Sequence, residues 1–379
     1  MAKSRIRYAP TARGANRYSA SNVKRASLAT LAIAISGSLA LAACGGGGSD
    51  EASPSSTSKR TTTTTAPVLA PFTGLPDPSG ASQGRAALNI KVSNAPEARP
   101  QSGLDQADVV WEEVVEGGIT RFLAMFQSNS PSAIGPVRSV RLTDPGIVWP
   151  VGGIFAFSGG AKYALDGINK APVVLVDESR AGSAMYRDRS RQAPHNLYGK
   201  GDALFAKGGT PVPPPALFTY AKEVRTRSGA LPVTAARVGF NGSFAVDWSW
   251  DSASRSWLRN AGGRPFMAAS GKQIQATNVV VMSVSYRGGV GSMGAEGVLT
   301  GEGKVLVLTD GVAIEGKWMR SSVSQVTRFV DLKGAVIPLT PGNTWVEMPD
   351  VTYAVTTTAA VVPATSTTLK APTKSTAKP

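Results

Sequence analysis

Carboxylate and guanidinium side chains are concentrated between residues 99 and 144 of the 379-residue chain. The charged residues of this stretch that could do chemistry are Glu112, Glu116, Arg121, Arg138 and Arg141. Arginine presents a planar set of N–H donors that matches a carboxylate or phosphate, and paired carboxylates can act as acid and base. These residue types therefore predict either a site that binds an anion or an acid–base site that stabilises developing negative charge.

A β-hairpin is predicted to position the first three of these side chains. Two β-rich runs, residues 107–115 and 119–127, are separated by a Gly-Gly pair, which supplies the positive φ angles of a two-residue turn. In that register the strand period of two places Arg121 diagonal to both Glu112 and Glu116. The simpler interpretation of this face is a set of solvated surface ion pairs, which are common and weak.

The opposite face of the hairpin is the expected core face. It carries Trp111, Val115, Phe122, Ala124 and Phe126. Glu113 also falls on this face, which indicates burial with a purpose, a position at the hairpin edge, or a register that is wrong by one residue. A helix over residues 107–116 is the competing interpretation, but it would stack the like charges of Glu112 and Glu116 and run through four valines.

The two later arginines are expected on a short helix. A Gly-Pro pair at residues 135–136 fits the first turn of a helix, and Pro145 fits its end. Arg138 and Arg141 would then share one face beside the helix N-terminus, with Ser139 as an extra hydroxyl donor, so the segment predicts a binding position for phosphate or carboxylate. The alternative is an amphipathic turn whose arginines pair with Asp144 or with the hairpin glutamates.

The single histidine, His195, stands just before a predicted helix at residues 197–207. Asn196 is a natural N-cap for that helix and is also a candidate ligand-binding residue. The helix dipole would disfavour protonation of His195 and leave a neutral imidazole that can act as a base or hydrogen-bond donor. A structural role for this histidine and a role in the site both remain open.

Several segments resemble the YerB-type bacterial lipoproteins. They are ARPQSGL (98–104), ADVVWEEVVEGGITRFLAMF (107–126), GPVRSVR (135–141), APHNLY (193–198) and PGNTWVEM (341–348). The resemblance extends over residues 71–350 and implies an extracytoplasmic lipoprotein with an N-terminal and a C-terminal part. It implies no activity, because that family has a domain of unknown function and offers no catalytic residues to carry over.

The N-terminus has the layout of a lipoprotein signal peptide, predicted over residues 1–43. The first 25 residues hold seven Lys or Arg and no acid, and a small-residue apolar run leads to the sequence LAAC at residues 41–44. Cys44 is the predicted lipidation residue, which would anchor the protein to the extracytoplasmic face of the cell membrane through acyl chains such as palmitate. An uncleaved N-terminal helical anchor is the alternative. Because Cys44 is the only cysteine, the chain can form no internal disulfide.

The rest of the chain divides by composition. Residues 44–70 form a Gly/Ser/Thr-rich tether and residues 353–379 a Thr/Ala/Pro/Lys tail, both expected to be flexible. The predicted fold is α+β: a mixed α/β N-terminal domain at 71–228 carries the hairpin and the site, and a mainly β C-terminal domain follows at 229–352. Helices are also expected at 160–170 and 216–226, and strands at 86–92, 153–157 and 172–176. In the second part Trp248, Trp250 and Trp257 indicate either a carbohydrate-stacking surface or an aromatic core.

The charge balance suits an exported protein. The signal peptide accounts for seven of the 40 basic residues, so the remaining chain has 33 basic and 25 acidic residues and a net charge of +8 instead of +15. A diffuse positive charge fits partners such as an anionic wall polymer, a lipid headgroup or an envelope protein. No basic stripe with interleaved aromatic residues occurs, so nucleic acid is not an expected partner.

Two functions from different classes remain. The first is the binding of an anionic cell-envelope ligand or partner. The second is an envelope hydrolase or transferase that uses Glu112 or Glu116 with Arg138, Arg141 and His195. The sequence predicts no cofactor and no metal site, because one histidine and one cysteine exclude the usual zinc sites and Cys/His pairs and no GxSxG, HExxH or Walker-type loop occurs. A carboxylate-bound Mg²⁺ or Ca²⁺ at Glu112, Glu116 or Asp144 is an unsupported alternative.

Overall fold

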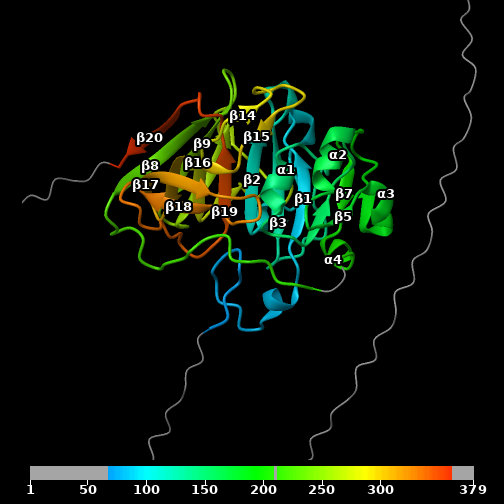
Figure 1. Cartoon of the computed structure of the whole chain (residues 1–379), viewed down its shortest axis with the longest axis horizontal. Helices are drawn as coiled ribbons and strands as arrows, with labels where there is room; N and C mark the ends of the chain where they lie inside the picture. Colours follow the sequence, from blue (N-terminus) through cyan, green and yellow to red (C-terminus); the bar gives the residue numbers. More distant parts are fainter. Residues whose placement is uncertain (1–66, 209–210, 361–379) are drawn as a thin grey trace, which may run out of the picture. The chain divides into compact units, whose positions relative to one another are not determined.

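The computed structural model describes residues 67–208 and 211–360. The predicted signal peptide, the predicted lipidation residue Cys44 and the tether as far as residue 66 lie outside the described residues. The last tether residues belong to the folded body, because Leu69 pairs with Pro76 and Ala70 is buried. The fold is α+β, which confirms the predicted class, and the α-helices lie with the N-terminal strands in Figure 1. No helix among the described residues is long and apolar enough to cross a membrane.

One twisted sheet runs through both parts of the chain. The N-terminal part contributes β1 (Leu88–Ser93), β2 (Val109–Val114), β3 (Thr120–Phe126), β4 (Ile154–Ala156) and β5 (Val174–Val176). The C-terminal part contributes β8 (Ala230–Gly239), β9 (Ala245–Asp251), β10 (Ser256–Ala261), β11 (Arg264–Pro265), β13 (Asn278–Met282), β16 (Gly301–Thr309), β17 (Val312–Arg320) and β19 (Thr344–Met348). Their order across the sheet is β11-β10-β9-β8-β17-β16-β13-β19-β2-β3-β1-β4-β5.

Smaller elements complete the body. Three strands pair off the main path: β12 (Gln275–Ala276) with β10, β18 (Arg328–Asp331) with β17, and β20 (Val355–Ala359) with β8. Two-stranded sheets are formed by β6 (Met185–Arg187) with β7 (Leu197–Gly199), and by β14 (Tyr286–Arg287) with β15 (Glu296–Gly297). The α-helices are α1 (Asp144–Val148), α2 (Lys162–Ile168), α3 (Glu178–Ala181) and α4 (Gly201–Phe205). The 3₁₀ helices are Ala81–Gly84, Pro96–Ala98, Leu104–Gln106, Glu116–Gly118 and Gly182–Ala184.

The two parts of the chain meet where β19 pairs with β2. The pairing is parallel and sets Glu347 beside Glu112. Because β2 also pairs with β3, the hairpin lies inside the sheet, and every residue of β2 and β3 is buried. Aromatic rings close one side of this joint, where Trp345 packs edge-on against Phe122 at 5.3 Å between ring centroids. The hairpin is therefore a core element with both faces covered, which rules out a solvated Glu/Arg/Glu face.

The predicted hairpin is present, but its register differs by one residue from the prediction. The connection has three residues, Glu116 to Gly118, and the N–H of Val115 donates to the carbonyl of Ile119. Glu113 therefore lies opposite Arg121. The two glycines adopt φ angles of 73° and 71°, so the Gly-Gly pair serves the turn as expected, but it is compatible with both loop lengths. The shift turns Glu112 to the other face of the sheet, away from Arg121. Glu113 instead lies on the same face as Arg121.

The helix expected between residues 135 and 145 does not form. This segment runs extended beside β1, where Val137 pairs with Val92 and the N–H of Arg138 donates to the carbonyl of Lys91. The helix α1 begins at Asp144 instead, with Pro145 in its first turn. The prediction read this proline as a helix stop, although a residue without an N–H fits a helix start equally well because the first N–H groups have no partner inside the helix.

Two other helix predictions are wrong, the first in part and the second entirely. Residues 197–199 form strand β7, and α4 begins only after it, so Asn196 is not an N-cap. The Asn196 side chain instead accepts a hydrogen bond from Arg187 at 2.7 Å. No helix forms at residues 216–226, where Tyr220 makes a β-bridge to Leu339. Long-range strand pairing thus overrides local helix propensity at both places.

Part of the predicted tail also belongs to the sheet. Residues 355–359 form β20, antiparallel to the ten-residue strand β8. Their β-branched Val and Thr side chains favour an extended backbone, and β8 offers a long edge on which they can pair. Residues 361–379 lie outside the described residues.

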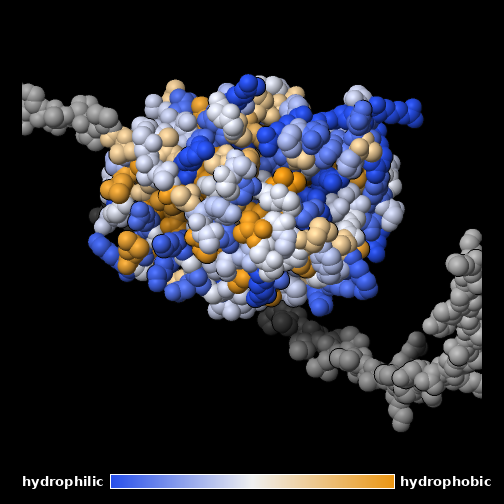
Figure 2. All heavy atoms as spheres, turned by 90° about the horizontal axis from the view of Figure 1, so that it is seen from above, coloured by the Kyte–Doolittle hydropathy of each residue, from blue (hydrophilic) through white to orange (hydrophobic). Residues whose placement is uncertain are grey.

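The surface and the core are typical of a globular body. Trp248 and Trp257 are fully buried, so they belong to the core and not to a carbohydrate-stacking surface. On the face drawn in Figure 2, hydrophilic residues are interspersed with small hydrophobic patches.

Candidate functional site

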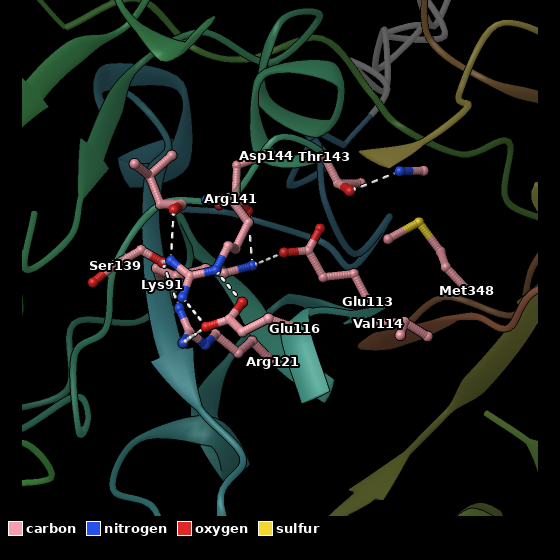
Figure 3. A network of polar contacts seen from close by, with 12 residues as sticks. Lys91, Glu113, Val114, Glu116, Arg121, Ser139, Arg141, Thr143, Asp144 and Met348 are labelled. Atoms are coloured by element: carbon pink, nitrogen blue, oxygen red, sulfur yellow. Dashed lines mark hydrogen bonds and ion pairs between the residues drawn. The ribbon is translucent and has the colours of Figure 1, made fainter. Parts of the chain in front are cut away.

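The candidate site is built around the carboxylate of Glu116 in the hairpin loop. Arg121 of β3 approaches it with Nη2 at 2.7 Å from Oε1, and Arg141 approaches it with Nε at 2.5 Å from Oε2 and with Nη2 in contact with Oε1 (Figure 3). Burial alone raises the pKa of Glu116, but the hydrogen bond from Arg141 and the charges of both arginines outweigh it and lower the pKa to about 2. Glu116 is therefore ionised at neutral pH and clamped by two guanidinium groups.

Arg138 adds a third positive charge beside this clamp. Burial and the charge of Arg141 both lower the pKa of Arg138, which places the two guanidinium groups in one electrostatic environment. Among the described residues, Arg138 makes one side-chain hydrogen bond, from Nη1 to the carbonyl of Pro194 at 3.3 Å. Its Nε and the Nε of Arg121 are buried and have no partner among the residues that the structure describes. The site thus has two guanidinium groups that hold one carboxylate and a third guanidinium group, that of Arg138, within electrostatic reach of them.

His195 and Ser139 border the same cluster. The carbonyl of Ser139 accepts from Arg121 Nη1 at 3.0 Å, and its hydroxyl lies 3.4 Å from that of Ser158. Burial and the charge of Arg138 lower the pKa of His195, so its imidazole is neutral at pH 7. The expected protonation state is the same, but its cause is the nearby arginine and burial, because no helix begins at this residue. Within residues 67–208 and 211–360, Nδ1 of His195 has no hydrogen-bond partner.

A fully buried ion cluster lies directly behind the clamp. Lys91 of β1 places its Nζ 2.8 Å from Oδ1 of Asp144 and in hydrogen-bond contact with Oε1 of Glu113, and all three side chains have zero exposure. The other oxygen of Asp144 accepts the backbone N–H of Arg141 at 2.6 Å. Asp144 therefore connects the buried cluster to one of the two arginines that hold Glu116, as Figure 3 shows.

The acidity of Glu113 in this cluster is strongly perturbed. Burial is the main cause, and the nearby charge of Asp144 adds to it, so that the pKa of Glu113 rises to about 7 despite the opposing effect of Lys91. Its Oε2 is buried and has no partner among the described residues. Lys91 and Glu113 are not among the site residues predicted from the sequence. The signals were a lysine inside the predicted strand AALNIKV and a glutamate on the expected core face.

Glu112 belongs to a different cluster on the opposite face of the sheet. It accepts hydrogen bonds from Arg259 of β10 at 2.8 Å, from Thr120 at 2.6 Å and from Asn94 at 3.1 Å. Arg259 is fully buried and stacks at 4.1 Å from the ring centroid of Phe266. The structure thus does not bring Glu112 to the arginines.

A second carboxyl group, that of Glu347, joins the Glu112 cluster. Glu347 accepts a hydrogen bond from the indole N–H of Trp248 at 2.8 Å. Burial and then the charge of Glu112 raise the pKa of Glu347 well above its usual range. This cluster again combines two carboxyl groups with one cation, Arg259, inside the core.

A separate hollow of about 500 Å³ lies between the N-terminal loops and residues 342–343. Three carboxylates line it, but each has a local structural task. Asp77 accepts from Ser79 and Ser82, Asp105 accepts from Ser270, and Asp108 accepts the backbone N–H groups of residues 127 and 128. These contacts anchor loops and leave the arginine cluster as the better candidate site.

The chemistry available at the arginine cluster is the recognition of negative charge. Guanidinium donors in a partly buried position bind carboxylates and phosphates strongly, because such charge-assisted hydrogen bonds are shorter and stronger than neutral ones. No group of three or more His, Cys, Asp or Glu side chains in the described ranges is arranged to hold a metal ion. A proton-donating carboxylic acid is not provided by Glu116, because its pKa of about 2 keeps it ionised.

The fold and the site together define a two-part α+β protein whose parts share one sheet and whose joint holds buried charges. The chain matches two family models, "Protein of unknown function (DUF3048) N-terminal domain" over residues 72–210 and "Protein of unknown function (DUF3048) C-terminal domain" over residues 236–346. It therefore belongs to the DUF3048 family. The predicted domain boundary between residues 228 and 229 falls in the interval between the two matches and stays a prediction.

Relatives of known name agree with this assignment. The chain is 30% identical over 291 residues to the "Putative lipoprotein YerB" of Bacillus subtilis (strain 168), which covers 74% of this chain and 85% of that relative. It is also similar to the crystal structure of the YerB protein from Bacillus subtilis, with 27% identity and a TM-score of 0.65 over 76% of this chain and 99% of that one. The resemblance to YerB-type lipoproteins is thus confirmed, and the relative's name is consistent with attachment to a membrane.

Proposed function

We propose that this protein is a lipoprotein that is anchored through Cys44 on the extracytoplasmic face of the cell membrane and binds an anionic cell-envelope ligand at Arg121, Arg138 and Arg141. The observation that carries the proposal is the imbalance of charge at the cluster, where Arg121 and Arg141 contact the carboxylate of Glu116 and the third guanidinium group, that of Arg138, interacts with it only through its charge. A ligand with a phosphate or carboxylate group would supply the missing negative charge.

The free donors indicate where such a group binds. Glu116 occupies two N–H groups of Arg141 and one of Arg121. Arg138, in contrast, has one long hydrogen bond of 3.3 Å to a backbone carbonyl, and nearby His195 offers a neutral imidazole. The anion would therefore approach from the side of Arg138 and His195.

Binding is favoured over the alternative of a hydrolase or transferase by the position of the two candidate acids. Glu112 is buried on the other face of the sheet and engaged with Arg259. Glu116 is the carboxylate at the arginines, but a group with a pKa of about 2 is a poor general acid or base at neutral pH. Neither carboxylate is thus placed and poised for acid–base work at this site.

The proposal is tested by measuring the affinity of the full-length lipoprotein in detergent for inorganic phosphate by titration calorimetry. Arg138→Met should weaken binding about tenfold or more, since a charge-assisted hydrogen bond contributes about 1.5–3 kcal/mol. It should change the free energy of unfolding by less than about 1 kcal/mol. The matched control is Arg225→Met, which removes an exposed arginine outside the cluster and should leave both quantities unchanged. Equal affinity of the Arg138 variant and the wild type would contradict the proposed site.

A further inference from the structure

The buried cluster of Lys91, Glu113 and Asp144 has one negative charge too many. One ammonium group faces two carboxylates, all three side chains have zero exposure, and Oε2 of Glu113 has no partner among the described residues. A buried charge without full compensation destabilises the fold, and the uptake of a proton removes that charge. The carboxyl with the unpartnered oxygen is the natural acceptor of that proton.

Titratable or charged groups from several elements surround Glu113, whereas β19 places the uncharged Met348 beside it. Lys91 comes from β1, Arg121 lies opposite on β3, and Asp144 begins α1. The phenol of Tyr286 on β14 and the side chain of Arg141 also lie within electrostatic reach. The direction of the effect on anion binding follows from the net charge of the network. The network has four cations and three carboxyl groups: Lys91, Arg121, Arg138 and Arg141 with Glu113, Glu116 and Asp144. Its net charge is +1 when Glu113 is ionised and +2 when Glu113 is protonated.

We propose that Glu113 is a proton switch for the anion site, so that proton uptake by its carboxyl strengthens anion binding at Arg121, Arg138 and Arg141. The inference rests on the proposed function and adds its regulation. The path is short, because Asp144 contacts Lys91 with one oxygen and the backbone N–H of Arg141 with the other, while Glu113 lies beside Arg121 in the β2–β3 ladder. A change of one charge in this position acts on two of the three arginines directly.

The raised pKa of Glu113 determines the pH range in which the switch works. Burial and the charge of Asp144 raise the pKa of Glu113 from 4.5 to about 7. This pKa belongs to the cluster of interacting charges and not to Glu113 alone. Below this pH the site carries the higher positive charge and binds an anion more tightly. Above it the ionised Glu113 opposes the incoming anion. The envelope of a bacterium faces an external pH that varies, so such a link would tune binding to the surroundings.

The experiment uses sulfate as the probe, because its charge stays constant between pH 6 and pH 8. Affinity is measured on the full-length chain in detergent at pH 6, 7 and 8 and at fixed ionic strength. The wild type should lose about threefold to tenfold in affinity from pH 6 to pH 8, the size expected for one charge acting over several ångströms in a partly screened site. Glu113→Gln should bind at every pH about as tightly as the wild type does at pH 6. Glu302→Gln is the matched control and should keep the wild-type slope, because Glu302 is an exposed glutamate in a surface ion pair with Lys317 outside the cluster.

The outcomes separate the two proposals. Absence of sulfate binding at every pH would overturn the proposed function itself. Binding that is independent of pH in the wild type, or a full slope retained in Glu113→Gln, would overturn the proton switch alone. A measurement without substitutions guards against a variant that does not fold: in protein with ¹³C-labelled glutamate, sulfate should raise the midpoint of one buried carboxyl, since linkage is reciprocal. Unmoved carboxyl midpoints on addition of saturating sulfate would refute the switch.

Discussion

Glu113→Gln should make the protein more stable at pH 8 than the wild type. The folded state raises the pKa of Glu113 from 4.5 to about 7, so between these pH values the folded chain binds a proton that the unfolded chain has released. The contribution of Glu113 to the free energy of unfolding therefore falls as the pH rises from about 4.5 to about 7 and then stays level. A glutamine cannot ionise, and the variant escapes this loss.

The magnitude follows from the size of the shift. One pKa unit corresponds to about 1.4 kcal/mol, so the shift of Glu113 makes the cost of its ionisation on the order of 3 kcal/mol. The substitution also leaves Lys91 with one carboxylate, Asp144, at 2.8 Å, which is a balanced pair. The difference in stability between variant and wild type should thus grow by about 3 kcal/mol between pH 5 and pH 8.

Chemical denaturation at pH 5, 6, 7 and 8, followed by tryptophan fluorescence, measures this difference. Glu302→Gln is the control, because Glu302 is an exposed glutamate in a surface ion pair with Lys317 and should show no such growth. A stability difference that is the same at all four pH values would refute the reasoning, because it would mean that Glu113 has no excess proton affinity in the folded state.

Three further outcomes are expected. Lys91→Met should lower the free energy of unfolding by about 3–5 kcal/mol at pH 8, because it leaves two buried carboxylates without a cation, whereas the exposed Lys162→Met should cost below about 1 kcal/mol in the same denaturation assay. Glu116→Gln should raise the affinity for sulfate in calorimetry, since it frees the guanidinium groups that this carboxylate holds; a weaker affinity would show that Glu116 organises the site. Cys44→Ser should move the protein from the membrane fraction to the soluble fraction and abolish labelling by a palmitate analogue; a variant that stays in the membrane after signal cleavage would contradict lipidation at this residue.

The class of fold and most strands could be predicted from the sequence, because β-branched runs and glycine punctuation indicate strands reliably. The register of the hairpin could not. A Gly-Gly pair fits a two-residue and a three-residue connection, and alternation of apolar and polar residues distinguishes the faces only when one of them meets solvent. In β2 every residue is buried, so the pattern held no such information. The position of Glu113 on the expected core face was the one indication that the predicted register was wrong by one residue.

The arginines are candidates because of their residue types, but the local structure around them could not be predicted from the sequence. Pro145 fits a helix stop and a helix start, and the choice depends on the strand pairing of residues 137 and 138 with β1, which no local pattern reveals. The same holds for His195, whose neutral state was expected from a helix that does not form and results from Arg138 and burial. Contacts between residues far apart in the sequence decided both cases.

The two consecutive glutamates of β2 point to opposite faces of the sheet, and each enters a cluster of two carboxyl groups and one cation. Glu113 meets Lys91 and Asp144, whereas Glu112 meets Arg259 and Glu347. Both clusters favour an extra proton, but their surroundings differ. Aromatic rings enclose Arg259, and its cluster joins the N-terminal part to the C-terminal part, so its proton acts on the joint between them.

The Lys91 cluster, in contrast, reaches the partly exposed clamp through Asp144 and Arg141. A proton on Glu113 changes the charge at the anion site, whereas a proton on Glu347 changes only the number of charges buried in the core. Glu347→Gln should therefore alter stability and leave the pH dependence of sulfate binding as it is in the wild type. If it removed that dependence, the link between proton and anion would run through the joint of the two parts and not through Glu113.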